Sequence, residues 1–143
     1  MKLFLRDWGP AVVWSLCIFV FSTSLFTAQN TSTFLVPLLT WLFPQALSAT
    51  IVHMHEFIRK SAHFVEFFIL SLTLLRGVRG GRPGWRISWA LAALAIAACY
   101  ASFDEVHQAF VPGRTASVYD VLLDTSGAGV GQIFAALLAR LRL

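Results

Sequence analysis

The sequence predicts an all-α fold: a polytopic membrane four-helix bundle with an additional interfacial or re-entrant segment between helices 1 and 2. Hydrophobic residues make up 57% of the 143-residue chain, and charged residues make up only 13%. That charged share is about half of the roughly 25% found in soluble domains. Four apolar stretches each approach the roughly 20 residues that a helix needs to cross a bilayer. No linker divides the chain, so we expect one domain over residues 1–143.

The predicted membrane helices lie at about residues 9–28, 56–75, 86–107 and 118–138. Residues 29–55 contain an apolar run that is broken by Pro37 and Pro44. Because this run is too short to span comfortably, we expect it to lie at the interface or to re-enter the membrane. His53 and His55 are expected to be loop residues there. The segment 76–86 contains four Arg, four Gly and one Pro, which is typical of a solvated turn.

The basic residues predict an orientation in the membrane. With four spans, one side receives both termini and the 76–86 turn, and it holds Lys2, Arg6, Arg76, Arg79, Arg82, Arg86, Arg140 and Arg142. The other side holds only Arg59, Lys60 and Arg114. Cytoplasmic loops are enriched in Lys and Arg, so both termini are expected to be cytoplasmic. The net charge of +4 does not indicate nucleic-acid binding, because most of the chain lacks a solvated face for a basic patch.

Acidic residues and histidines gather at the opposite, outer ends of the helices. On the second helix, an arc of about 120° contains Glu56, Arg59, Lys60, His63 and Glu66. An ionisable side chain that faces lipid costs several kcal/mol, so this stripe is expected to face the bundle interior. Glu66 lies deepest, and Lys60 or His63 is its expected partner.

The third predicted helix ends in the sequence DEVHQ. Asp104 shares a helix face with His107 and Gln108, and a carboxylate at this spacing can hold the imidazole and raise its basicity. Glu105 points about 100° away. The Pro-Gly turn that follows returns the chain to the membrane, and Arg114 at its tip offers a rigid fork suited to phosphate or carboxylate.

The fourth predicted helix combines acidic and small residues on one face. Asp120 and Asp124 lie one turn apart, and Gly127, Ala128 and Gly131 continue the same face. Small residues at this spacing allow close helix approach inside a membrane. Both aspartates are therefore expected to point at the second and third helices, completing an outer polar pocket.

Several functions fit such a pocket, and the sequence does not decide between catalysis and binding. The charges can form a salt-bridge network that fixes helix register. A divalent metal such as Mg, Mn or Zn is a possible cofactor, because Asp and His side chains suit these ions. An enzyme that acts on a phosphorylated envelope lipid would clamp phosphate with Lys60 and Arg114, and Asp104 with His107 would serve as its general base. A non-catalytic binder of a cell-wall precursor or lipid-tailed antibiotic would use the same clamp.

Two stretches of the chain also resemble a known family. RKSAHFVEFF at residues 59–68 and DEVHQAFVPGRTASVYDVLLDTSGAGVG at residues 104–131 are similar to the VanZ-like family of bacterial membrane proteins. The resemblance implies a multi-pass protein of the bacterial cytoplasmic membrane, and the family name comes from a protein associated with resistance to the glycopeptide teicoplanin. By this resemblance, the candidate catalytic residues are His63, Glu66, Asp104, Glu105, His107, Asp120 and Asp124, and the candidate substrate-binding residues are Lys60, Gln108 and Arg114.

Overall fold

The computed structural model describes residues 2–141, except for the side chain of Lys2, and it confirms an all-helical fold with four helices able to cross a membrane. The elements in order are α1 (Lys2–Phe21), the 3-10 helix η1 (Ser24–Phe26), α2 (Ala28–Leu42), α3 (Ser48–Arg79), α4 (Ile87–Ala109) and α5 (Val118–Leu141). Arg142, one of the basic residues used above to predict orientation, lies outside the described residues.

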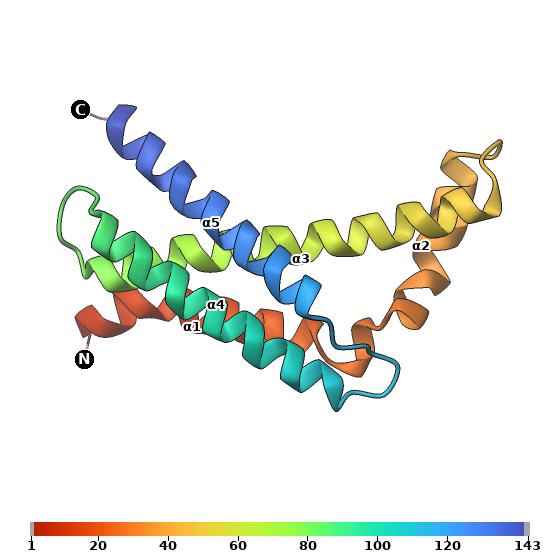
Figure 1. Ribbon diagram of the computed structural model, residues 1–143, viewed down its shortest axis with the longest axis horizontal. Helices are drawn as coiled ribbons and strands as arrows, with labels where there is room; N and C mark the ends of the chain where they lie inside the picture. The colour runs from red at the N-terminus through yellow and green to blue at the C-terminus, as the bar shows by residue number, and fades with distance from the viewer. Residues whose placement is uncertain (1, 142–143) are drawn as a thin grey trace.

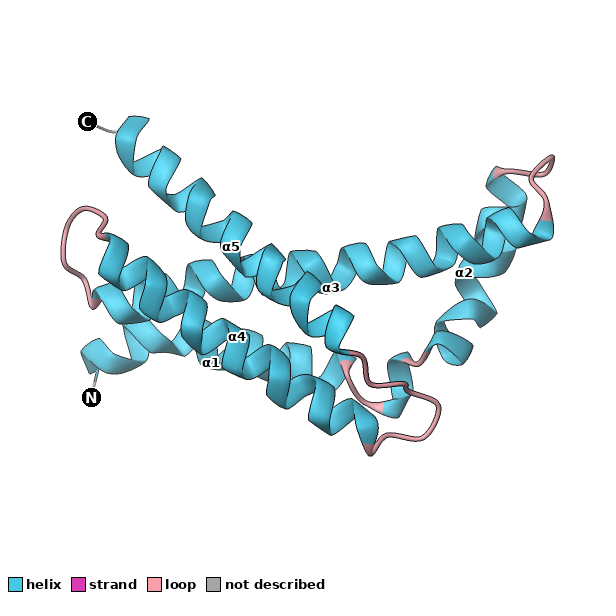
Figure 2. Cartoon of the chain, in the orientation of Figure 1, coloured by secondary structure: helices cyan, strands magenta, loops and turns pink. Residues whose placement is uncertain are grey.

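The long helix α3 organises the molecule. Figure 1 shows α5 crossing α3, with α1 and α4 beside the second half of α3 and α2 beside its first half. Both chain ends and the loop between α3 and α4 lie at one end, whereas the other loops lie toward the opposite end (Figure 2). The Arg-rich segment 76–86 was expected to be a turn, but residues 76–79 are the last turn of α3 and only residues 80–86 form the loop. This segment is separated from the polar residues that precede and follow the α4–α5 loop.

The contact between α3 and α5 depends on glycine. A Cβ atom built on Gly127 would overlap the carbonyl oxygen of Phe64, and one built on Gly131 would overlap the Ser71 hydroxyl. Ala128 between them is fully buried. The predicted small-residue face is therefore confirmed, because only a residue without a side chain permits two helix backbones to approach this closely.

Helices α1 and α4 complete the core. The Trp14 indole donates a hydrogen bond to the carbonyl oxygen of Glu66 at 2.8 Å, and the Tyr100 hydroxyl donates to that of Ser15 at 2.6 Å. The apolar core is formed by small α4 residues against larger α3 residues: Phe67, Leu70, Ala93, Ala97 and Ala101. Large apolar side chains are exposed along all four long helices, as expected where the surrounding solvent is lipid.

The first half of α3 differs from the prediction. Helix α3 begins at Ser48 rather than near residue 56, so His53 and His55 are helical and not loop residues. His55 is buried and its Nε2 atom lies 3.0 Å from the Thr31 hydroxyl oxygen on α2. Helix α3 thus begins earlier than its hydropathy predicts, and packing against α2 stabilises these added first turns.

The lengths of α2 and α3 fit different positions relative to a bilayer. Helix α2 has 15 residues, about 22 Å at 1.5 Å per residue, which is shorter than a hydrocarbon core of about 30 Å. Helix α3 has 32 residues, about 48 Å on the same scale. Helix α3 is therefore longer than the hydrocarbon core, and α2 lies beside its first half.

Helix α1 ends seven residues earlier than expected, at Phe21 instead of near residue 28. Residues 22–27 contain η1, and Thr27 then begins α2 because its hydroxyl accepts a hydrogen bond from the backbone N–H of Asn30. A threonine in this position caps a new helix. Helices α4 and α5 start within one residue of their predicted starts, and they end two or three residues after their predicted ends.

Candidate functional site

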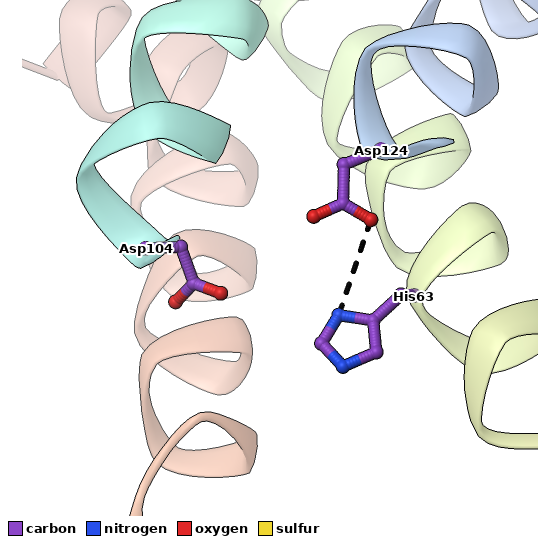
Figure 3. Close-up of side chains that lie close together, drawn as sticks. All are labelled: His63, Asp104 and Asp124. Atoms are coloured by element: carbon purple, nitrogen blue, oxygen red, sulfur yellow. Dashed lines mark ion pairs between the residues drawn. The ribbon is translucent and has the colours of Figure 1, made fainter. Parts of the chain in front are cut away.

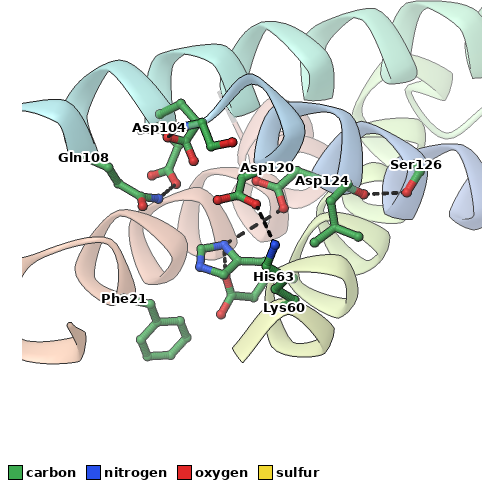
Figure 4. A network of polar contacts seen from close by, with 12 residues as sticks. Phe21, Lys60, His63, Asp104, Gln108, Asp120, Asp124 and Ser126 are labelled. Carbon is green, nitrogen blue, oxygen red and sulfur yellow. Dashed lines mark hydrogen bonds and ion pairs between the residues drawn. The ribbon is translucent and has the colours of Figure 1, made fainter. Parts of the chain in front are cut away.

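Polar side chains from α3, α4 and α5 meet beside the crossing of α3 and α5 (Figure 4). Helix α3 supplies Lys60, His63 and Glu66, and α4 supplies Asp104 and Gln108. Asp120 and Asp124 come from the first two turns of α5. The small-residue face of α5 continues directly from Asp124, so the close approach of α5 to α3 also carries both aspartates toward α3, as predicted.

The centre of the site is formed by His63, Asp104 and Asp124. Each of these residues offers one nitrogen or oxygen atom, and the three atoms lie within 4.8 Å of one another. Figure 3 shows the three side chains converging from three different helices. Asp104 and Asp124 are each only 1% exposed. The centre is therefore withdrawn from solvent, which strengthens every electrostatic interaction within it.

Glu66 belongs to the same centre. Its Oε2 atom lies 3.8 Å from His63 Nδ1, and Asp124 Oδ1 lies 4.0 Å from the same nitrogen. The prediction that Lys60 or His63 would approach Glu66 is thus confirmed for His63. Both distances exceed those of a hydrogen bond, and within the described residues neither carboxylate oxygen has a hydrogen-bond partner.

Asp104 is held by a different neighbour from the one predicted. The Gln108 side-chain amide donates a hydrogen bond to Asp104 Oδ2 at 2.7 Å. The His107 ring instead stacks on Phe19 with ring centroids 4.6 Å apart, and its Nδ1 atom has no hydrogen-bond partner among residues 2–141. The expected Asp104–His107 pair is therefore not assembled, because the helix turn that brings Gln108 to Asp104 directs His107 toward α1.

The remaining predicted carboxylates lie around this centre. Lys60 Nζ lies 3.6 Å from Asp120 Oδ1, and the two side chains are 63% and 35% exposed. Glu105 accepts a hydrogen bond from the backbone N–H of Ser117 at 3.0 Å, which fixes the loop before α5. The charged stripe of α3 therefore faces the interior only at its deeper end, because Glu56 and Lys60 are exposed.

Arg114 joins the α4–α5 loop to the end of α1. Its Nη2 atom donates to the carbonyl oxygens of Phe21 and Phe26, the latter at 2.9 Å. Its Nη1 atom lies 3.4 Å from Gln108 Oε1. The guanidinium thus satisfies carbonyls that a helix end leaves without partners. The sequence predicted that the Arg114 guanidinium would bind a ligand anion, but most of its N–H donors bind groups of the protein itself.

Two cavities adjoin the centre and share three lining residues: Arg59, His63 and Arg114. The first cavity has a volume of about 250 Å³ and is otherwise mostly apolar, with Phe21, Phe26, Leu35, Ile58 and Ala62 in its wall. The second has a volume of about 320 Å³, and its wall includes Glu56, Lys60, Glu105, Gln108, Ser117 and Asp120. An apolar space and a polar space therefore meet at two guanidinium groups and one imidazole.

Arg59 was not among the residues predicted for the site. It is half-buried, it lines both cavities, and within the described residues its side chain has no ion-pair partner. Its helix spacing offered a signal, since Arg59, Ala62, His63 and Glu66 follow the i, i+3, i+4, i+7 pattern of one helix face. Arg59 was left out of the predicted site because it lies near the start of the predicted span, where a side chain is expected to be exposed.

The two guanidinium groups influence each other. Burial lowers the pKa of the Arg114 guanidinium from its ordinary value, and the charge of Arg59 lowers it further, whereas Asp104, Glu66 and Glu105 raise it. Arginine nevertheless keeps its charge in proteins. Two like charges beside one space favour an anion between them, because an anion offsets their repulsion.

Comparison with known proteins supplies a family. Among curated proteins and among solved structures, no match to this chain was found. A family model described as VanZ/LLP1 matches residues 8–139, a range that includes every residue of the site. The match covers most of the chain and confirms the resemblance seen in its motifs. With its four apolar helices, this chain is therefore a membrane protein that belongs to the VanZ/LLP1 family.

Proposed function

We propose that this protein binds a phosphorylated envelope lipid or lipid-linked cell-wall precursor at the outer side of the bacterial cytoplasmic membrane. The observation that carries the proposal is the meeting of an apolar and a polar cavity at Arg59, His63 and Arg114. An amphiphilic ligand fits both spaces, with its chain beside Phe21, Phe26 and Leu35 of the apolar cavity and its head group in the polar cavity. A wholly polar ligand leaves the apolar space unused.

The charges around the polar cavity support an anionic head group. Its acidic residues already have partners: Lys60 pairs with Asp120 at 3.6 Å, and Glu105 accepts a backbone hydrogen bond. Arg59 has no such partner among residues 2–141. A guanidinium binds phosphate through parallel N–H donors, and these charge-assisted bonds are about twice as strong as neutral ones. Arg59 is thus the main clamp of the proposal.

The orientation is part of the proposal. The basic segment 76–86 and both chain ends lie at the end of the bundle opposite the α4–α5 loop. Lysine and arginine are enriched on the cytoplasmic side of membrane proteins, so we place both termini in the cytoplasm and the pocket on the outer side. The long polar start of α3 and the short helix α2 then lie at the outer interface.

Binding is favoured over catalysis by the arrangement of Asp104 and His107. The Asp104–His107 pair that would serve as the general base is not assembled, because Gln108 holds Asp104 and the His107 ring stacks on Phe19. The family takes its name from a protein associated with teicoplanin resistance, and we propose the same association for this chain. A pocket that holds an outer-leaflet precursor acts at the membrane surface that a glycopeptide antibiotic reaches. The expected consequence in cells is a change in teicoplanin susceptibility when the protein is expressed.

Arg59→Gln is expected to weaken binding of a polyprenyl monophosphate by about tenfold, because one charge-assisted contact with phosphate is lost. Native mass spectrometry of the detergent-purified protein can compare the polyprenyl monophosphate with the corresponding polyprenol. The wild type should prefer the phosphorylated lipid, and Arg59→Gln should lose most of this preference.

Arg140→Gln serves as the control for loss of one arginine charge, since Arg140 is exposed and lies near the far end of α5, away from both cavities. It should leave binding unchanged. Equal binding of both lipids by the wild type, or equal loss in both variants, would contradict the proposal. Teicoplanin susceptibility of cells that express the wild type or Arg59→Gln gives a second readout.

A further inference from the structure

The buried centre of the site contains more negative charge than its surroundings neutralise. Glu66, Asp104 and Asp124 surround His63. Nearby cations are committed elsewhere, since Lys60 pairs with Asp120 and Arg114 donates to backbone carbonyls. Carboxylates withdrawn from water need a cation or a proton close to them. Arg59 and Arg114 line the adjoining cavities with His63, but within the described residues neither forms an ion pair with Glu66, Asp104 or Asp124.

Asp124 gives an independent sign of a missing partner. Its side chain is only 2% exposed, and its Oδ1 atom has no hydrogen-bond partner within the described residues. Figure 3 shows that the carboxylate is directed at His63 and lies across from Asp104. Glu66 Oε2, which approaches the same His63 nitrogen, is likewise buried without a hydrogen bond. Both oxygens thus lie near His63 Nδ1 without a hydrogen bond to it or to any other described group.

The separations of these atoms fit a shared metal ion better than direct contact. His63 Nδ1 lies 3.8 Å from Glu66 Oε2 and 4.0 Å from Asp124 Oδ1. Those distances are too long for hydrogen bonds. Two donors that each bind one ion at about 2.0–2.2 Å lie roughly 3–4 Å apart. The observed separations lie within that range.

We propose that His63, Asp104 and Asp124 bind one divalent first-row transition metal ion such as Zn²⁺ or Mn²⁺, with the Glu66 carboxylate beside His63. An imidazole nitrogen among carboxylate oxygens favours these ions over Ca²⁺ and Mg²⁺, which prefer oxygen ligands alone. Gln108 acts as a support for the site, because its amide fixes the Asp104 carboxylate at 2.7 Å in the way that outer groups orient metal ligands. The ion supplies the positive charge that the centre lacks.

Metal content of the purified full chain tests this proposal without any lipid, so its outcome is separate from that of the proposed lipid binding. The protein is stripped with a chelator, incubated with Zn²⁺ or Mn²⁺, passed through a desalting column and measured by inductively coupled plasma mass spectrometry. The wild type should retain about one ion per chain. Asp124→Asn and Asp104→Asn, which keep the side-chain shape, should lower the affinity for the ion at least about tenfold.

Asp120→Asn is the matched control, because it removes a carboxylate one helix turn before Asp124 that pairs with Lys60 instead. It should retain the ion. Thermal unfolding followed by circular dichroism checks that each variant is folded, and added metal should raise the midpoint of the wild type and of Asp120→Asn only. The proposal fails if the folded wild type retains no ion and shows no metal-dependent shift, or if Asp104→Asn and Asp124→Asn bind the ion as the wild type does.

Discussion

Gly127→Leu is expected to unfold the bundle, with a loss of about 3 kcal/mol or more in the free energy of unfolding, at the upper end of overpacking effects. Even a Cβ atom at this position overlaps the backbone carbonyl of Phe64. A backbone atom in a helix cannot rotate away as a side chain does, so α5 must separate from α3. The same movement withdraws Asp124 from His63, so the variant should also lose every function of the site.

Gly129→Leu provides the control for this prediction. Gly129 lies two residues further along α5, and a Cβ atom there meets no atom within 4 Å. The variant has the same added side chain and the same gain in helix propensity, but it should fold as the wild type does. Size-exclusion chromatography in detergent and the thermal unfolding midpoint measure both variants. Equal stability of Gly127→Leu and Gly129→Leu would show that α3 and α5 are not packed through this face.

Arg114→Met is expected to lower the free energy of unfolding by about 2 kcal/mol, because hydrogen bonds to a charged group contribute about 1.5–3 kcal/mol. The substitution keeps an apolar stem of similar length but removes the donors to the carbonyls of Phe21 and Phe26. Those carbonyls belong to the end of α1 and to η1. Hydrogen exchange should therefore increase at residues 22–31 and 110–117 before it increases elsewhere.

The control for Arg114 is Arg82→Met. The Arg82 guanidinium also donates to two backbone carbonyls, those of Val78 and Arg79, but they lie within four residues of it in the chain. Its loss frees a local turn and removes an exposed cation–π contact with Trp89, so stability should fall by only about 1 kcal/mol. If Arg114→Met proves as stable as the wild type yet fails to bind the polyprenyl monophosphate, Arg114 is a ligand clamp and not an anchor.

The local signals of the chain predicted α4 and α5 well. Both helices are continuous apolar stretches, and both begin within one residue of the expected position. Spacing also identified the face of α5 that carries Asp120, Asp124, Gly127 and Gly131, because residues three or four apart always share a helix face. The same rule placed His63 beside Glu66 on α3. These features need only the helical repeat and no knowledge of the neighbouring helices.

Contacts between residues that are distant in the sequence were harder to predict. His55 belongs to α3 because Thr31 and the rest of α2 pack against it, whereas a hydropathy pattern places a polar histidine outside a span. Asp104 had two neighbours on its own helix, His107 and Gln108, at nearly equal spacing. Which of them it bonds to depends on the position of Phe19 on α1, because that ring occupies the side toward which His107 turns.

Local signals in the chain were therefore enough to predict the class of the protein, its four long helices, the small-residue face of α5 and most of the polar side chains that come together beside it. All of these follow from composition and from the local geometry of a helix. The tertiary structure alone decided that Arg114 anchors α1, that Arg59 lies between two cavities, and that Asp124 and Glu66 both approach His63 without a hydrogen bond. The physical reason is that these contacts depend on how whole helices cross, and a crossing is set by the sum of many packed side chains.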